Sequence, residues 1–103
     1  MAKCIFTHKA VEDISKIWSE ASETSTENQA DNYYILLVDA SKEVAKKPAI
    51  GKNYDQLSPE ILGFAAGKHI IFYRKRATKG VEIIRILHEE FSRKGAKISQ
   101  RNT

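Results

Sequence analysis

The chain has little of several features that mark particular classes of protein. Its 103 residues include a single cysteine, Cys4, so no internal disulfide bond can form, and we expect Cys4 to be a small buried residue. No stretch approaches the roughly 18–20 consecutive apolar residues that a membrane-spanning helix needs. The opening MAKCIFTHKA has no apolar core of the kind found in a secretory signal. We therefore expect a cytoplasmic protein that makes no membrane contact.

The two halves of the chain carry net charges of opposite sign. Residues 1–60 hold seven Lys and Arg against ten Asp and Glu, a balance of −3, whereas residues 61–103 hold ten against three, a balance of +7. With 29% charged and 42% hydrophobic residues, the composition is that of a globular domain and not of a disordered or membrane chain. The basic half predicts an anionic partner, either nucleic acid or an acidic protein, and composition leaves both open.

The first part of the sequence predicts a strand followed by an amphipathic helix. KCIFT (3–7) has the apolar character of a short strand, and Thr7 is a suitable helix N-cap, with Glu12 and Asp13 placed early enough to favour a helix start. SETST (22–26) is expected to break the helix. Apolar residues recur at spacings of three and four, and we expect them on the inward face: Ala10, Val11, Ile14, Ile17, Trp18 and Ala21.

A second helix and a long loop follow. TENQ (26–29) fits a capping box, and Pro48 ends the helical pattern. Two helices joined by a short polar link predict an antiparallel helix hairpin. Residues 48–59 form a loop in which three apolar residues are expected to act as anchors: Ile50, Tyr54 and Leu57.

Three strand-like segments close the domain, at residues 60–66, 69–76 and 80–88. The breaks between them are too short for parallel crossovers, so we expect an antiparallel meander. One or two helical turns capped by Gly95 are expected next, and residues 96–103 form a basic, frayed tail. The prediction is a single domain over residues 1–95, a two-layer α+β fold of order β-α-α-β-β-β with an optional final helix, in which a helix hairpin packs on a small antiparallel sheet.

Catalytic and metal-binding motifs are absent from the sequence. Gly51-Lys52 fails as a phosphate loop, because position 46 is Lys where glycine is needed and position 53 is Asn where Ser or Thr is needed. The three histidines have no metal-ligand spacing, so we expect neither a metal nor a cofactor. Glu89 and Glu90 are expected to lie on a solvated face.

Charged residues within the last two strands are the most informative feature. HIIFYRK and VEIIRILH place His69, Arg74, Arg85 and His88 among apolar residues, where unpaired charge is costly to bury. One interpretation is that the arginines form structural pairs, for example with Glu82 or with a helix carboxylate. The other is that all four residues form a cationic binding face, extended by Lys68, Lys75, Arg76 and Lys79. Periodicity does not fix the strand register, and a shift of one residue would exchange the two faces.

Four segments of the chain, in order, resemble the ParE toxins of bacterial toxin–antitoxin modules, within the wider ParE/RelE superfamily. They are FTHKAVEDISKIW, ENQADNYY, IGKNYDQL and HIIFYRK…VEIIRILH, and the likeness runs from about residue 4 to residue 88. The resemblance implies a fold in which a helix hairpin packs on an antiparallel sheet, in agreement with the predicted element order.

The resemblance also implies a function and partners. ParE toxins inhibit DNA gyrase and are held inactive by a ParD-type antitoxin, which binds operator DNA through a ribbon-helix-helix domain. Operator DNA would thus be reached only indirectly, through the antitoxin. The RelE branch of the superfamily instead cuts mRNA on the ribosome with arginines, lysines and a terminal tyrosine or histidine.

The ParE branch fits this sequence better, because no tyrosine follows His88 and carboxylates stand in its place. We therefore expect a toxin that acts by binding and is not an enzyme. If it is a nuclease, the catalytic candidates are His88, Arg85 and His69. The segment HEEFSRKG differs from the usual ParE ending, which leaves a non-toxic, antitoxin-binding member as a third alternative. The candidates for contact with target or antitoxin are His69, Arg74, Lys75, Arg76, Arg85, His88 and Phe91.

Overall fold

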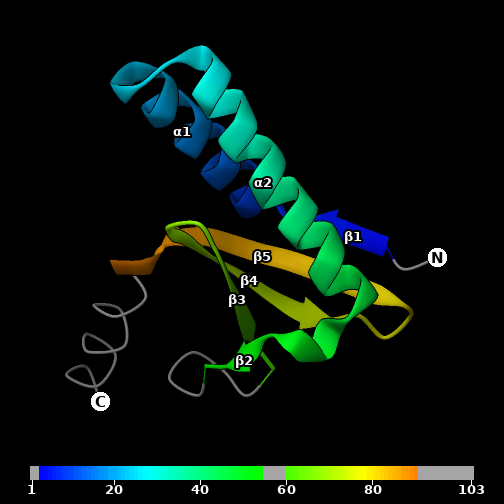
Figure 1. Ribbon diagram of the computed structural model, residues 1–103. Coiled ribbons are helices and arrows are strands. Elements are labelled where there is room, and N and C mark those ends of the chain that lie inside the picture. Colours follow the sequence, from blue (N-terminus) through cyan, green and yellow to red (C-terminus); the bar gives the residue numbers. More distant parts are fainter. Residues whose placement is uncertain (1–2, 55–59, 91–103) are drawn as a thin grey trace.

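The protein is built in two layers (Figure 1). The computed structural model describes residues 3–54 and 60–90, and within these ranges two long helices cover one face of a five-stranded sheet. The elements are β1 (Lys3–Phe6), α1 (His8–Thr24), α2 (Glu27–Lys46), the 3-10 helix η1 (Pro48–Ile50), β2 (Lys52–Asn53), β3 (Leu62–Ala66), β4 (His69–Lys75) and β5 (Gly80–His88). The predicted α+β class and element order are confirmed, with η1 and β2 as additions.

Both helices begin at the residues that their capping patterns predict. The Thr7 hydroxyl accepts a hydrogen bond from the Ala10 N–H at 3.1 Å, and the Thr26 hydroxyl accepts one from the Gln29 N–H at 3.1 Å. Each cap satisfies one of the backbone N–H groups that a helix start leaves without a partner. The predicted break at residues 22–26 was placed too early, since α1 continues to Thr24.

The sheet has the strand order β1-β5-β4-β3-β2. Strands β3, β4 and β5 form the predicted antiparallel meander. The sheet as a whole is mixed, however, because β1 runs parallel to β5, from Lys3 beside Gly80 to Phe6 beside Ile83. The two helices between β1 and the meander provide the long crossover that a parallel pair requires. The expectation of a purely antiparallel sheet was therefore wrong at this edge.

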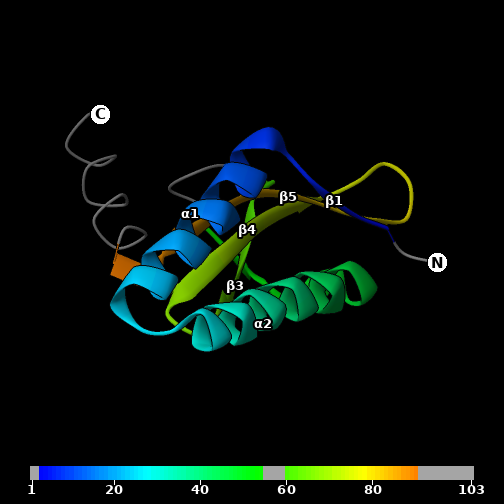
Figure 2. The same ribbon diagram turned by 90° about the horizontal axis from the view of Figure 1, so that it is seen from above.

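The hydrophobic core lies between the helices and the sheet (Figure 2). Leu37 and Val44 of α2 and Ala10 and Ile14 of α1 contribute from the helix layer. The sheet contributes Ile71, Tyr73, Val81, Ile83 and Ile86. Burial of each large apolar side chain stabilises the fold by roughly 1.5–3 kcal/mol. The fully buried Tyr73 also donates its hydroxyl hydrogen to the Pro48 carbonyl at 2.6 Å and accepts from the Gly51 N–H at 2.9 Å, which ties η1 to the sheet.

The register between β4 and β5 decides which face each charged residue occupies. Directly paired residues share a face of the sheet. Ile71 pairs with Ile86 on the helix side, and two residues further along His69 pairs with His88, on the same side. Phe72 pairs with Arg85 in the same register, on the opposite face, and an irregularity between Phe72 and Tyr73 then shifts the register so that Tyr73 pairs with Ile83. On that face Arg74 pairs with Glu82.

Some predicted core positions lie outside the core. Val11 is 50% exposed, and Trp18 is half-buried in a groove between the helices, where its Nε1–H donates to Asp31 Oδ1 at 2.8 Å. The apolar stripe of α1 is wider than the surface that the sheet covers, so Val11 faces solvent and Trp18 lies beside α2. In the 48–59 loop, Tyr54 packs edge-on against Phe72 as expected, but Ile50 is 40% exposed. Leu57, most of the expected final helix and the tail lie outside the described residues.

Candidate functional site: a histidine pocket and two engaged arginines

Two histidines meet at the end of the β4–β5 hairpin nearest the turn between the helices. The rings of His69 and His88 have centroids 5.4 Å apart and an interplanar angle of 78°. They line a pocket of about 720 Å³, which we call the histidine pocket. Its lining consists of Ile17, Glu20, Ala21, Thr24, Ser25, Gln29, Tyr33, Gly67, Lys68, His69 and His88. The pocket thus combines apolar helix residues with two imidazoles from the sheet.

Tyr33 of α2 positions His69 and the turn that precedes it. Its hydroxyl lies 2.6 Å from His69 Nδ1 and accepts a hydrogen bond from the Lys68 N–H at 2.9 Å. The Tyr33 ring also packs so close to Gly67 that a Cβ atom there would lie 2.7 Å from the ring. Gly67 has φ +61, which a tight two-residue hairpin turn requires at its first position. Sequence reasoning did not assign this role to Tyr33.

The hydrogen bonds fix the tautomer of one of the two histidines. His88 Nδ1 accepts from the Glu90 N–H at 3.1 Å, which leaves the ring proton on Nε2. The Tyr33 hydroxyl accepts from the Lys68 N–H and has a second lone pair, so it can donate to His69 Nδ1 or accept from it.

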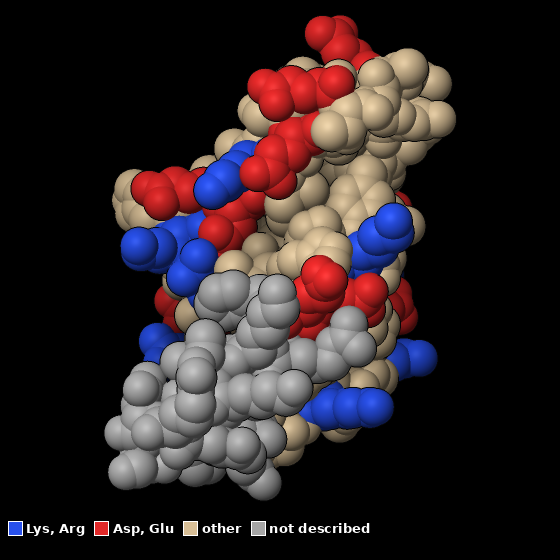
Figure 3. All heavy atoms as spheres, turned by 90° about the vertical axis from the view of Figure 1, so that its left-hand side faces the viewer, with Lys and Arg blue, Asp and Glu red and all other residues tan. Residues whose placement is uncertain are grey.

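Neighbouring groups act on the pKa of His69 in opposite directions. Burial, and second the neighbouring His88, lower the pKa of His69 below its ordinary value of 6.5, while Glu20 and Glu89 act in the other direction with less effect. His69 is thus harder to protonate than a free imidazole. Figure 3 looks onto this end of the molecule and shows acidic side chains above and below a stretch of uncharged surface. As expected, Glu89 and Glu90 are exposed.

Arg85 is engaged by a helix carboxylate. Its Nε lies 2.7 Å from Asp13 Oδ2 and its Nη2 lies 3.0 Å from Asp13 Oδ1, a two-pronged ion pair. Asp13 Oδ2 also accepts from the Ile86 N–H at 3.0 Å. The hydrogen bonds with Asp13 raise the pKa of Arg85 above its already high ordinary value, so the guanidinium stays charged. Asp13 therefore holds α1 against the edge of β5 beyond the end of β1, and does not act at the helix start as predicted.

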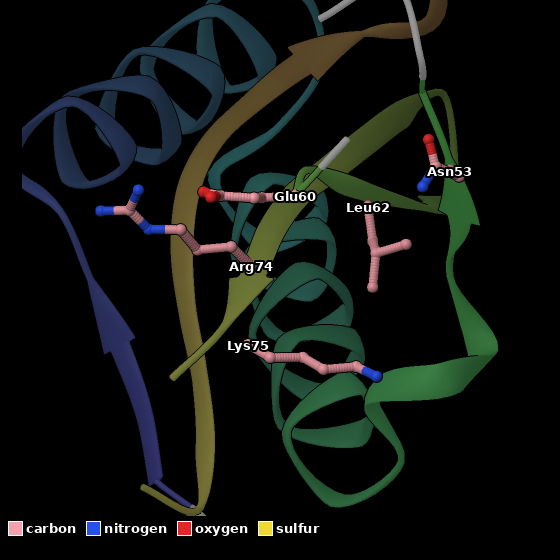
Figure 4. A pocket seen from close by; sticks show the side chains of 5 residues that line it. All are labelled: Asn53, Glu60, Leu62, Arg74 and Lys75. Atoms are coloured by element: carbon pink, nitrogen blue, oxygen red, sulfur yellow. The ribbon is translucent and has the colours of Figure 1, made fainter. Parts of the chain in front are cut away.

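Arg74 of β4 forms an ion pair with a carboxylate of the neighbouring strand β5. Its Nε lies 2.8 Å from Glu82 Oε1, between side chains that are 49% and 31% exposed. Figure 4 shows Glu60 pointing toward the Arg74 side chain, and Lys75 pointing the other way, toward η1 and β2. These residues line a pocket of about 590 Å³ together with Asn53 and Leu62.

The predicted cationic face of four residues does not exist. His69 and His88 lie on the helix side of the sheet, whereas Arg74 and Arg85 lie on the opposite face and pair with carboxylates. The alternative of structural arginine pairing, with Glu82 and with a helix carboxylate, is confirmed. The catalytic set for a nuclease, His88, Arg85 and His69, is consequently not assembled at one site.

The remaining candidates are dispersed. Lys75 and Arg76 lie at the other end of β4, away from the histidines, and Phe91 is outside the described residues. Across residues 3–54 and 60–90, no cluster of three or more His, Cys, Asp or Glu side chains could hold a metal ion. Within the same ranges, no helix is both long and apolar enough to span a membrane.

The comparison with known protein families identifies the family to which this chain belongs. Residues 4–92 match the sequence model of the family described as "ParE toxin of type II toxin-antitoxin system, parDE". The chain belongs to the ParE toxin family. Toxin ParE1 of Mycobacterium tuberculosis (strain CDC 1551 / Oshkosh) is 29% identical over 76 residues, which are 74% of this chain and 78% of that protein.

Other relatives give the same result. Toxin ParE1 of Caulobacter vibrioides is 29% identical over 86 residues, 84% of this chain and 88% of that protein. Among solved structures, a chain of the "Chromosomal ParDE TA system from P. aeruginosa" superposes with a TM-score of 0.73 at 18% identity, and the match covers 85% of this chain and 96% of that chain. At this identity the structural match supports the fold alone, which agrees with the predicted RelE/ParE-like architecture.

Proposed function

We propose that this ParE family member is the toxin of a type II toxin–antitoxin module and inhibits DNA gyrase by binding it. A ParD-like antitoxin with a ribbon-helix-helix domain neutralises it in the cytoplasm and connects it to operator DNA. Family membership over residues 4–92 supports the toxin assignment. The observation that carries the binding mechanism is the engagement of Arg85 by Asp13.

Cleavage of RNA requires cations that stabilise the charge developing on the phosphate, together with a group that moves protons. In this chain Arg85 and Arg74 are both neutralised by carboxylates, on the face opposite the histidines. Glu20 at the histidine pocket would repel a phosphate. These contacts favour a protein that acts by surface recognition and not by phosphoryl transfer.

The proposed contact surface has two parts. His88 provides an Nε2–H donor beside His69 in a pocket with apolar walls, which suits a partner side chain that is apolar with a hydrogen-bond acceptor at its tip. Lys75 and Arg76 provide exposed or half-exposed charge at the other end of β4. Arg74 and Arg85 act on the fold and contribute to binding only through the shape of the sheet.

A ribosome-dependent ribonuclease is the second candidate function. The observation in its favour is the histidine pair, because two imidazoles 5.4 Å apart can act as an acid and a base. Lys68 lines the same pocket and would be its cation. This mechanism predicts that His88→Ala abolishes cleavage while antitoxin binding persists.

The test compares both activities in one experiment. The protein is expressed inducibly without its antitoxin, purified, and added to gyrase with relaxed plasmid and, separately, to translating ribosomes. Our proposal predicts lost supercoiling with intact mRNA, and restored supercoiling when the neighbouring antitoxin is added. Intact supercoiling with cut mRNA would establish the ribonuclease. No response in either assay would favour a non-toxic, antitoxin-binding member.

A further inference from the structure

Positive charge gathers at the end of the molecule opposite the histidine pocket. There the last turn of α2 and the turn between β4 and β5 line a pocket of about 540 Å³. Both segments lie at the end away from the turn between the helices (Figures 1 and 2). Four of its lining residues are cations, and we call them the basic end: Lys46, Lys75, Arg76 and Lys79.

Within residues 3–54 and 60–90, no ion pair neutralises the basic end. Across the residues that the structure describes, the ion pairs are Arg74–Glu82 and Arg85–Asp13, and neither involves this pocket. Glu82 lies two residues after Gly80 but is engaged by Arg74. The backbone of Lys3 on the neighbouring strand β1 runs against Gly80, although Lys3 does not line the pocket. Four like charges around one pocket repel one another, and an anionic ligand would relieve this repulsion.

The chemistry of the pocket favours nucleic acid over an acidic protein. Its other lining residues are small or polar, namely Ala45, Pro48, Thr78 and Gly80. The large exposed apolar side chains of the described chain, Ile5, Val11, Tyr34, Ile35, Leu36 and Ile50, do not line it. Protein interfaces depend on buried aromatic and apolar anchors, whereas interfaces with a DNA backbone are polar and strongly positive.

One effect opposes anion binding at this position. The C-terminal end of α2 carries the partial negative charge of the helix dipole and lies beside the pocket. Lys46 is in the last turn of α2 and compensates that partial charge. Lys75 ends β4, and Arg76 and Lys79 lie in the turn between β4 and β5. Strands have only small net dipoles, so the charge of these three residues is not offset in this way.

We propose that the basic end binds the phosphate backbone of double-stranded DNA directly and without sequence preference. This goes beyond the proposed function, in which operator DNA is reached through the antitoxin. The contact would add affinity wherever the protein is brought to DNA, whether by an antitoxin or by a DNA-bound target. It does not depend on gyrase inhibition, so the two proposals can fail separately.

The test is the salt dependence of DNA binding by the purified full chain. Fluorescence anisotropy of a labelled duplex of random sequence is followed at KCl concentrations from 50 to 200 mM. The variant Lys75→Gln/Lys79→Gln removes two charges from the basic end. The control Lys9→Gln/Lys16→Gln removes two exposed charges elsewhere, both on α1. Both variants lose two positive charges and therefore have the same net charge. Both also keep every basic residue of the C-terminal tail.

The basic-end variant is expected to bind more weakly, and its slope of log K against log salt should be shallower by about 1.8, since each phosphate contact contributes about 0.9. The control should keep the wild-type slope. Equal changes in both variants, or no binding of the duplex at 50 mM KCl, would overturn the proposal. So would tighter binding of polyglutamate than of the duplex at equal salt, because the surface would then serve an acidic protein. Unchanged thermal unfolding of both variants verifies that they fold.

Discussion

The β4–β5 hairpin carries two arginines and two histidines that are used in opposite ways. Arg74 and Arg85 lie on one face and form ion pairs with Glu82 and Asp13, whereas His69 and His88 lie on the other and line the histidine pocket. Charge within a strand therefore does not by itself mark a functional residue. The position of its nearest carboxylate decides whether the charge belongs to the fold or to a partner.

Removal of Asp13 should have the largest effect on this contrast. Asp13→Ala leaves Arg85 without its ion pair and the Ile86 N–H without its acceptor. We expect a loss of about 2 kcal/mol in the free energy of unfolding, less than for a fully buried pair because the Arg85 side chain is 39% exposed. Urea denaturation measures it, with Glu23→Ala, at an exposed position on the same helix, as the control. A change within 0.5 kcal/mol, roughly that of an ordinary surface substitution, would mean that Arg85 is not structural.

Loss of the Tyr33 hydroxyl should have the next largest effect. Tyr33→Phe removes the partner of His69 Nδ1 and of the Lys68 N–H while it retains the ring over Gly67. We expect a loss of about 1 kcal/mol, the net value of a typical hydrogen bond, because water reaches the exposed Lys68. Tyr34→Phe, at an exposed neighbouring position, is the matched control and should change stability little. If the two variants unfold alike, Tyr33 does not hold His69 in place.

The second arginine pair should matter less than the first. Arg74→Ala breaks an ion pair whose side chains are 49% and 31% exposed, and such pairs contribute about 0–1 kcal/mol. Urea denaturation of Arg74→Ala and Asp13→Ala at the same salt concentration gives the comparison directly. A loss from Arg74→Ala that equals or exceeds the loss from Asp13→Ala would contradict the assignment of Arg85 as the main structural arginine.

The pH dependence of stability should show the smallest effect. Because the folded protein lowers the pKa of His69, the unfolded chain binds its proton first as pH falls below about 6.5, and stability is lost from there down through the folded pKa. His88 lies beside His69 on β5, Glu20 approaches from α1, Glu89 follows β5, and Tyr33 faces it from α2. His69→Asn keeps an acceptor for Tyr33 and removes the titration. Its free energy of unfolding should fall less between pH 7 and 5 than that of the wild type, and an equal fall would refute the cause.

Local patterns predicted the elements because their causes are local. The caps at Thr7 and Thr26 and the end of α2 before Pro48 follow from neighbouring residues, and β5 matches its predicted range of 80–88. The face that Arg85 occupies and its ion-pair partner could not be predicted in the same way. Its face depends on the irregularity between Phe72 and Tyr73, and its partner, Asp13, is 72 residues away.

The candidate site was predicted in part for the same reason. Sequence reasoning selected His69 and His88 but grouped them with the arginines, since only the register separates the two faces. It missed Tyr33 and Glu20 at the pocket, which approach the sheet through the packing of the helices. The one available signal was the Gly67–Lys68 pair, because a two-residue turn fixes His69 at the start of β4 beside whatever covers that turn.

A dose–response curve for supercoiling by purified gyrase tests the central claim, inhibition by binding and not by catalysis. The wild-type protein and His88→Ala are titrated against gyrase, and the affinity of each for the antitoxin is measured in parallel. The account predicts that His88→Ala shifts the curve several-fold to higher concentration and still reaches full inhibition, as expected when one contact among several is lost. Complete loss of the effect at every concentration, with antitoxin affinity unchanged, would contradict it and make His88 a catalyst.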